Sequence, residues 1–462
     1  MTDKFIPRRF SRRDFLKLGT RGTLAAALGG GVLSAMARHN LSYAAPVWPE
    51  TASGVALPPA RPAAATLNLR LAATDGYISL PGRRIFPTPN NTGGDPFAIP
   101  DDHGGLYVFG FVNVPLSDTL EQAINRVKGK VQGPAPIIDV TENDTLYITL
   151  LNTGLVGRPD LDDSHTIHWH GFDNPNAVFD GVPEVSIGVP PAREFPYFFR
   201  PRVPGTYIYH CHFEDSEHVQ MGMDGIVFIR PAGAPNQAYA DISTAFDREY
   251  TLLFNEIDTT PHDGLINVQE FVWSNYDPNY WVINSRSYPD TILTNDDIVG
   301  TDLEGRQPIS SLIQANEGET VLLRMANLGY EQQAMQMLGI RITVIGHDAT
   351  YLGPLVYQTD SIYIGPGEAR DVLFEAPAYN GSLPGGSDSN GPYNVYWFKN
   401  HHPQRLVNGA GENDNLGNSG PVEDIDGNPV ALGGQVTQVR VYGAGTLGPQ
   451  TSPNQTFGRT RP

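Results

Sequence analysis

Cys211, the only cysteine in this chain of 462 residues, stands between two histidines in the sequence Tyr-His-Cys-His at 209–212. The sequence His-Thr-Ile-His-Trp-His-Gly at 165–171 supplies three more histidines upstream. A single cysteine cannot form an internal disulfide, so its function is packing or chemistry. A thiolate with several imidazoles in reach is a set of ligands that suits copper.

Strand geometry divides these candidate ligands into two sets. The Gly-Thr-Tyr-Ile-Tyr run at 205–209 predicts a strand, in which neighbouring side chains point to opposite faces. His210 and His212 then point to one face and Cys211 to the other. The same alternation applies to the upstream cluster. The two predicted sets are His165 with Cys211, and His168, His170, His210 and His212.

A histidine and a methionine further downstream complete one predicted metal site. They belong to the segment Glu-His-Val-Gln-Met-Gly-Met at 217–223. Two histidines, one cysteine and a weak axial methionine form the trigonal site of blue copper electron-transfer proteins. Met221 is the less favoured axial ligand because its spacing from the histidine is short. The predicted ligands of this site are His165, Cys211, His218 and Met223.

Short strands joined by turns are predicted to hold these residues. The chain is 40% hydrophobic and has 49 glycines, 39 prolines and few helix-period stretches, which favours an all-β fold. Its length suits two domains. Residues 142–154 match 317–329 at a spacing of 175, and 191–199 match 366–374 more loosely at the same spacing. The shared spacing indicates two duplicated antiparallel sandwiches.

Domain boundaries follow from the repeat and from composition. We expect a copper-binding domain at 66–232 and a second domain at 249–445. Residues 46–65, rich in proline and alanine, are predicted to be a linker. Residues 446–462 have the composition of a flexible tail.

The motifs resemble those of the multicopper oxidase family, the laccases and their relatives. The resemblance rests on 165–171, on 205–212, on the turn at Asp180 and on the closing histidine and methionine. It implies two tandem cupredoxin-like Greek-key β-sandwich domains, all-β, with copper as cofactor. It also implies that Cys211, His210 and His212 carry electrons from a type 1 copper to the site where oxygen is reduced. By resemblance, the type 1 ligands are His165, Cys211, His218 and Met223, the type 2 ligand is His168, and the type 3 ligands are His170, His210 and His212.

The second half of the chain departs from the family pattern. A trinuclear cluster in this family takes eight histidines from two facing domains, and the first domain supplies four. Gln333, Gln336 and Leu338 stand where further ligands are expected, and the counterpart of the Cys211 motif falls near 396–399, without a cysteine. We therefore expect a degenerate second domain that has lost its metals. A homo-oligomer or a sister subunit could supply the missing ligands.

The other histidines of the second half are interpreted as structural or exposed, with a contact to copper across a subunit boundary as the alternative. Adjacent residues on a strand face opposite ways, so a His-His pair cannot copy a His-x-His pair. These residues are His262, His347, His401 and His402.

Three functions remain open at this stage. The leading hypothesis is an oxidase that takes single electrons from a phenolic or metal-ion donor at an exposed edge of His218 and passes them to oxygen. The acidic segment 213–217 could hold a cationic donor or orient a phenol, or could simply be a solvated loop. The alternatives are a copper nitrite-reductase-like enzyme and a non-catalytic blue copper protein for electron transfer or copper binding.

The N-terminal residues predict export. Ser-Arg-Arg-Asp-Phe-Leu-Lys at 11–17 resembles a twin-arginine motif and precedes a moderately apolar stretch at 22–37. We expect residues 1–45 to be a cleaved signal, with a retained anchor as the alternative, no stable membrane insertion after cleavage, and a periplasmic or secreted protein. A net charge of −19 excludes nucleic acid and anionic lipid as plausible partners.

Overall fold

A computed structural model describes residues 67–85, 105–409, 425–429 and 432–450. All of them belong to one compact unit, residues 58–462. The predicted signal at 1–45 and the predicted linker at 46–65 lie outside the described residues. Among the described residues, no helix has both the length and the apolar character needed to cross a bilayer.

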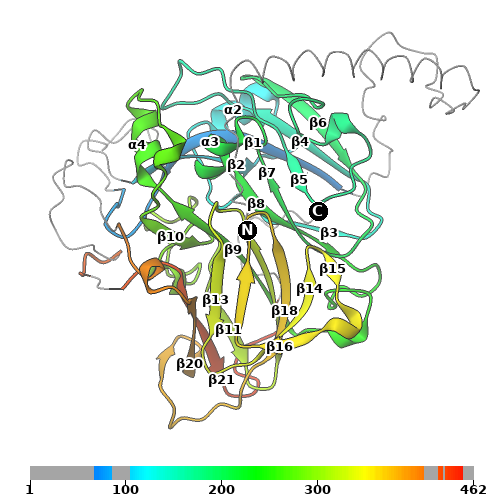
Figure 1. Cartoon of the computed structure of the whole chain (residues 1–462), viewed down its shortest axis with the longest axis vertical. Helices are drawn as coiled ribbons and strands as arrows, with labels where there is room; N and C mark the ends of the chain where they lie inside the picture. Colours follow the sequence, from blue (N-terminus) through cyan, green and yellow to red (C-terminus); the bar gives the residue numbers. More distant parts are fainter. Residues whose placement is uncertain (1–66, 86–104, 410–424, 430–431, 451–462) are drawn as a thin grey trace, which may run out of the picture. The chain divides into compact units, whose positions relative to one another are not determined.

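The first sandwich consists of two facing sheets (Figure 1). One sheet has the order β2-β1-β4-β6, and the other has the order β3-β8-β7-β5. Their bounds are β1 Leu67–Ile78, β2 Leu106–Asn113, β3 Ile138–Thr141, β4 Leu146–Asn152, β5 His168–His170, β6 Arg193–Phe199, β7 Gly205–His210 and β8 Asp224–Arg230. Three short helices flank the sandwich: α2 Leu120–Val127, α3 Asp215–Gln220 and α4 Thr259–Ile266.

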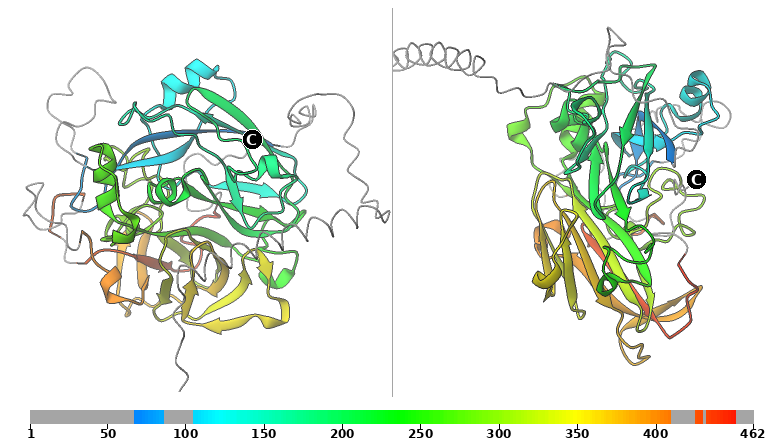
Figure 2. Two further views of the ribbon diagram at one scale, coloured as in Figure 1. Left: turned by 45° about the horizontal axis from the view of Figure 1, so that its top comes forward. Right: turned by 90° about the vertical axis from the view of Figure 1, so that its right-hand side faces the viewer.

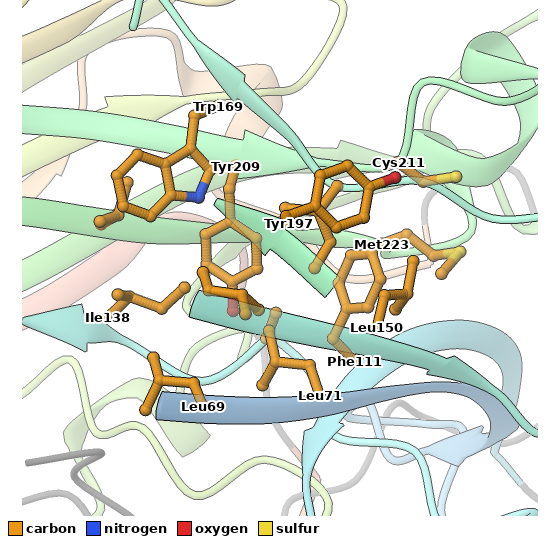
Figure 3. Packing of buried hydrophobic residues seen from close by; sticks show 14 of the residues in the cluster. Leu69, Leu71, Phe111, Ile138, Leu150, Trp169, Tyr197, Tyr209, Cys211 and Met223 are labelled. Carbon is orange, nitrogen blue, oxygen red and sulfur yellow. The ribbon is translucent and has the colours of Figure 1, made fainter. Parts of the chain in front are cut away.

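Alternating side chains of these strands fill the space between the two sheets (Figure 3). Leu67, Leu69 and Leu71 of β1 point into this core, as the two-residue period of a strand requires. The ring of Trp169 in β5 stacks on Phe199 of β6 at a centroid distance of 4.3 Å. This packing fixes β5, and therefore fixes the histidines on either side of Trp169.

The second sandwich repeats the two-sheet arrangement (Figure 2). One sheet runs β10-β9-β12-β18-β14-β15 with β16 paired to β14, and the other runs β11-β21-β20-β13-β17 with β19 paired to β20. Their bounds are β9 Arg248–Ile257, β10 Tyr280–Ile283, β11 Ile313–Asn316, β12 Thr320–Asn327, β13 Gln333–Met337, β14 Ile342–His347, β15 Thr350–Tyr351, β16 Tyr357–Thr359, β17 Ser361–Ile364, β18 Ala369–Glu375, β19 Gly385–Asp388, β20 Gly391–Asn400 and β21 Val436–Tyr442. Short 3₁₀ turns are η1 Ala177–Phe179, η2 Ile242–Thr244, η3 Trp273–Asn275, η4 Asp290–Ile292, η5 Gly353–Leu355 and η6 Pro403–Arg405.

The sequence repeat is also a repeat of hydrogen bonding. The side-chain amide of Asn152 donates to the carbonyl of Val189, and that of Asn327 donates to the carbonyl of Ile364. The two donors are 175 residues apart, and so are the two acceptors, which is the spacing of the sequence repeat. The predicted all-β fold of two tandem sandwiches is therefore confirmed.

The outer face of β7 and β8 packs against the second sandwich. Ile208 and Phe228 of the first sandwich form one buried cluster with Leu253, Ala326 and Ala369 of the second. The packing buries the outer face of the sheet that carries the Cys211 motif.

The end of the described chain is held by hydrogen bonds. Arg248 donates to the carbonyl of Gly448 at 2.7 Å, and Gln450 donates to the carbonyl of Glu249 at 3.0 Å. The described part of the predicted flexible tail is thus tied to the second sandwich, because its backbone carbonyls and amides find partners there.

Candidate metal centres

A buried thiol and two imidazoles form the first candidate centre. The Cys211 sulfur lies 3.8 Å from Nδ1 of His165 and 3.4 Å from Nδ1 of His218. All three residues are buried, and their candidate ligand atoms lie within 4.8 Å of one another. The backbone N–H of Thr166 donates to the sulfur at 3.4 Å. A thiolate with two imidazoles facing it is a donor set that fits copper.

Backbone pairing outside the regular strands fixes these three side chains. His165 exchanges two backbone hydrogen bonds with Val189. His218 lies on α3, in the helical turn that follows directly after the Cys211 motif. The short helix α3 therefore places the imidazole of His218 beside the Cys211 thiol.

Met223 belongs to the same part of the core. Its backbone N–H donates to the carbonyl of His218 at 3.0 Å, and its carbonyl accepts from the N–H of Cys211 at 3.1 Å. Its side chain is fully buried, and Figure 3 shows the Met223 and Cys211 sulfurs on the same side of the packed cluster. Met221 is also buried, but its carbonyl accepts from Phe109 instead. The preference for Met223 over Met221 as the axial ligand stays a prediction.

Burial and charge act differently on the two imidazoles of this centre. Desolvation and the neighbouring His218 hold the pKa of His165 well below its usual range. For His218, burial also disfavours the proton, but the charges of Cys211 and Asp163 more than offset it and raise the pKa to about 10. A metal ion on Nδ1 of His218 must therefore displace a proton at neutral pH.

Four further histidines form the second candidate centre. His168 on β5 pairs directly with His210 on β7, so their side chains share a face of the sheet. Ring centroids lie 5.2 Å apart for His168 and His210, 5.2 Å for His168 and His212, and 5.8 Å for His170 and His210. The candidate ligand atoms of His168, His170 and His210 lie within 4.8 Å of one another.

Backbone carbonyls orient two of these rings. Nδ1–H of His168 donates to the carbonyl of Asp180 at 2.6 Å, and Nδ1–H of His210 donates to the carbonyl of Cys211 at 2.8 Å. Each bond fixes the tautomer and leaves Nε2 free to bind a metal. Desolvation lowers the pKa of His168 and His170, and it lowers that of His210 to about 3. The three imidazoles are therefore neutral, which metal binding requires.

Cys211 joins the two centres through the backbone. Strand β7 ends at His210, yet the alternation continues because Cys211 still pairs with Met223. Its side chain points into the core, while the side chain of His210 points to the opposite face, as strand parity predicts. Thr166 bonds to both centres. Its backbone N–H donates to the Cys211 sulfur, and its hydroxyl accepts from the backbone N–H of His212 at 2.9 Å.

The edge of His218 is not exposed, contrary to the expectation from the sequence. The residue is fully buried, and its Nε2 lies 3.7 Å from a carboxylate oxygen of Asp163. Glu217 lies beside these two residues. Its carboxylate oxygen, an oxygen of Asp163 and a ring nitrogen of His218 lie within 4.8 Å of one another. The imidazole is covered because α3 folds back over the core directly after Cys211. Neither His218 Nε2 nor that Asp163 oxygen has a hydrogen-bond partner in the described part of the chain.

Sequence reasoning missed Asp163. The backbone carbonyl of Asp163 accepts a hydrogen bond of 2.7 Å from the side-chain amide of Asn152, the asparagine whose counterpart in the second sandwich is Asn327. This bond holds Asp163 beside His218. The available signal was its position two residues before His165, on the same side of an extended segment.

The counterpart of the Cys211 motif in the second sandwich lies further along the chain than predicted. Gln336 of β13 pairs with Lys399 of β20, as His168 pairs with His210. The counterpart of 210–212 is therefore 399–401, which overlaps the predicted stretch 396–399 only at Lys399. The predicted stretch begins too early in the chain because the sequence alone does not fix the register of two distant strands.

Amide groups occupy the place of the thiol site in the second sandwich. Asn400, the counterpart of Cys211, donates to Gln333 at 3.1 Å and to Gln435 at 2.7 Å. Gln333 also donates to Glu256 at 2.8 Å. All four side chains are buried. The amide groups of this network bond to one another and to Glu256, and the loss of metals from the second sandwich stays a prediction.

The other described histidines belong to neither group of candidate ligands. His262 is buried and donates from Nδ1 to the carbonyl of Tyr107 at 2.6 Å, as the structural interpretation requires. Nε2 of His347 faces the hydroxyl of Tyr357 at 3.4 Å. His401 and His402 are exposed.

Comparison with known proteins gives the family of the chain. Two family models, both described as multicopper oxidase, match residues 112–234 and 252–382, which together are more than half of the chain. The chain therefore belongs to the multicopper oxidase family, a family of copper oxidoreductases.

The most similar relatives include plant laccases. Putative laccase-9 of Oryza sativa subsp. japonica is 27% identical over 57% of this chain and 41% of that protein. Laccase-19 of the same subspecies is 28% identical over 54% of this chain and 38% of that protein. The chain thus spans about two-fifths of the length of these relatives.

Two solved structures share the fold. The blue copper oxidase of Nitrosomonas europaea superposes with a TM-score of 0.55 at 21% identity, covering 81% of this chain and 85% of that one. The multicopper oxidase mgLAC superposes with a TM-score of 0.54 at 20% identity, covering 81% and 86%. Their likeness supports the assignment of both sandwiches to the cupredoxin fold.

Proposed function

We propose that this chain is an exported copper oxidoreductase that takes single electrons from a small donor at the Cys211 centre and passes them to oxygen. The observation that carries the proposal is the covalent connection between the two centres. Cys211 faces one ligand set, while its neighbours His210 and His212 belong to the other. Copper bound at the first centre would supply a one-electron redox change that no side chain there provides.

The residues around Cys211 favour fast electron transfer. The sulfur accepts a hydrogen bond from Thr166 and lies in a core that excludes water. Buried ligands held by backbone pairing move little when the charge of the centre changes. From the sulfur, a few covalent bonds lead to either adjacent imidazole.

The donor is proposed to be a phenol or a metal ion that docks outside Asp163 and Glu217. Because His218 is buried behind these carboxylates, a donor meets them before it meets the imidazole. Carboxylates attract a cation and accept a hydrogen bond from a phenol. The acidic segment that the sequence singled out thus contributes Glu217 to this entrance.

Replacing Cys211 with serine tests the proposal. The Cys211→Ser variant, loaded with copper, should lose the intense visible absorption of a copper–thiolate centre and its oxygen consumption with phenolic and Fe(II) donors. Met221→Leu is the matched control, because it changes a buried sulfur nearby that is not a proposed ligand. A blue colour that survives in Cys211→Ser would overturn the assignment.

One observation favours the alternative of a nitrite-reductase-like enzyme. Three imidazoles with ligand atoms within 4.8 Å of one another are enough for a second, mononuclear copper. Nitrite consumption by the copper-loaded protein under anaerobic conditions would select this alternative, and oxygen consumption without nitrite turnover would reject it.

A further inference from the structure

The trinuclear copper cluster of the family does not fit the second centre. Such a cluster requires eight imidazoles, and the first sandwich provides His168, His170, His210 and His212. Four imidazoles shared among three ions leave little more than one ligand for each. The donor set is therefore too small for three ions.

The same four residues suit a single ion. Nitrogen ligands lie about 2 Å from a metal ion, so two nitrogens on one ion are about 3–4 Å apart. The ligand atoms of His168, His170 and His210 lie within 4.8 Å of one another, which small ring rotations can reduce to that range. His212 adjoins the three, with its ring centroid 5.2 Å from that of His168.

Within the described ranges, no histidine of the second sandwich joins the group of candidate ligand atoms formed by His168, His170 and His210. Gly367 adjoins the ring of His170, because a Cβ built on this glycine would lie 3.0 Å from its Nε2. Asp348 is the nearby charge that acts on His170. A peptide segment and a carboxylate therefore stand at this side of the cluster.

A second copy of the chain cannot supply the missing set from the described residues. His262 is buried and bonded, so the described candidates on a partner's second sandwich reduce to His347, His401 and His402. Three imidazoles, two of them on adjacent residues, do not make two His-x-His pairs. Even with all three, the cluster would not reach eight.

We infer that one chain binds two coppers, one at the Cys211 centre and one at His168, His170 and His210. The inference concerns the second centre of the proposed function and rests on that function for the identity of the metal. Two coppers store two electrons. Oxygen reduction by one chain then follows O₂ + 2e⁻ + 2H⁺ → H₂O₂. Two donor molecules each lose one electron, the protons come from solvent, and the product is hydrogen peroxide rather than water.

Copper analysis of the full chain tests the count. After loading with Cu(II) and removal of excess, we expect two coppers per chain, both detected by electron paramagnetic resonance. Cys211→Ser and His168→Gln should each retain one, and only His168→Gln should stay blue. Four coppers per chain, or a spin-silent pair, would overturn the inference.

A double variant tests donation from a partner. His401→Gln with His402→Gln should still bind two coppers per chain and serves as the matched control. Loss of a copper in this variant would show that a partner's imidazole belongs to the site, and the inference would then fail.

The ratio of donor oxidised to oxygen consumed tests whether oxygen is reduced to hydrogen peroxide. Two donor molecules should be oxidised for each oxygen consumed, and added catalase should return half of the oxygen. A ratio of four without peroxide would overturn the two-electron reaction. Two bound coppers without oxygen uptake would support the count and reject the proposed function instead.

Discussion

At the scale of single residues, burial decides what each polar group in the site can do. His165, Thr166 and His218 are almost completely buried around the Cys211 sulfur, and each has a role that depends on the absence of water. Thr166 is the clearest example, because its N–H bonds to the sulfur and its hydroxyl accepts from His212. Thr166 thus links the two centres by two hydrogen bonds, one from its backbone N–H and one to its hydroxyl.

Asp224, next to Met223, gives a pH-dependent prediction. Burial raises its pKa from the ordinary value of 3.8 to about 7, although Asn255 donates to it. A carboxyl group with a raised pKa stabilises the fold below about pH 4, and this contribution is lost as the pH rises through 7. Asp224→Asn should therefore be more stable than the natural protein at pH 8, by up to roughly 4 kcal/mol.

Urea unfolding at pH 5 and pH 8 measures this effect. The natural protein should lose stability between the two pH values, and the loss should be smaller in Asp224→Asn. Equal losses in both proteins would show that another group causes the pH dependence.

At the scale of elements, close backbone approach sets the position of β5. Gly181 has a φ of +83°, and a Cβ there would lie 2.3 Å from the carbonyl oxygen of Ile167 and 2.8 Å from the nitrogen of His168. The preceding carbonyl, of Asp180, holds the ring of His168. The turn at 180–181 therefore determines where this imidazole stands, and a side chain at the glycine must displace it.

Gly181→Ala should lower copper occupancy at the second centre and leave the blue absorption of the first centre unchanged. The reason is that the added methyl group pushes β5 away, while Cys211 lies on the neighbouring segment. Metal analysis together with the visible spectrum measures both effects.

Gly171→Ala is the matched control for this prediction. Gly171 also has a positive φ, of +73°, but a Cβ there would have no neighbour within 4 Å among the described residues. Gly171→Ala should lower the free energy of unfolding by about 1–2 kcal/mol through backbone strain, without loss of copper. Equal copper loss in both variants would point to backbone strain rather than to steric contact.

At the scale of the whole chain, a buried ionic network joins the two sandwiches. Arg230 of the first sandwich pairs with Asp139 at 2.8 Å and with Glu249 of the second. Arg324 of the second pairs with the same Glu249 at 3.2 Å. The Phe228 ring lies against both guanidinium groups, at 4.8 Å and 4.4 Å. The outer face of the sheet that carries the Cys211 motif is thus tied to the second sandwich by charge as well as by apolar contact.

Arg324→Met should destabilise the folded chain by about 3–5 kcal/mol, because the buried carboxylate of Asp371, 3.7 Å from Arg324, loses its guanidinium partner. Chemical unfolding followed by tryptophan fluorescence measures the change. Arg126→Met, which breaks the pair between the exposed Arg126 of α2 and Asp118, is the control and should leave the unfolding curve nearly unchanged. A neutral result for Arg324→Met would mean that apolar packing alone holds the sandwiches together.

The sequence by itself determined the candidate ligands, the two faces on which they lie and the all-β repeat. Spacing along a strand fixes the face of each side chain, so Cys211 and His210 could be assigned to opposite faces without any tertiary information. Likewise, the spacing of 175 residues predicted the duplication, and the structure adds that Asn152 and Asn327 make equivalent hydrogen bonds.

Only the tertiary structure decided the burial of His218, the approach of Asp163 and the register that equates Asn400 with Cys211. Each of these depends on how segments distant in sequence pair and pack. Strand register and the return of a loop over a core are set by long-range contacts, which a local pattern of residue types does not contain.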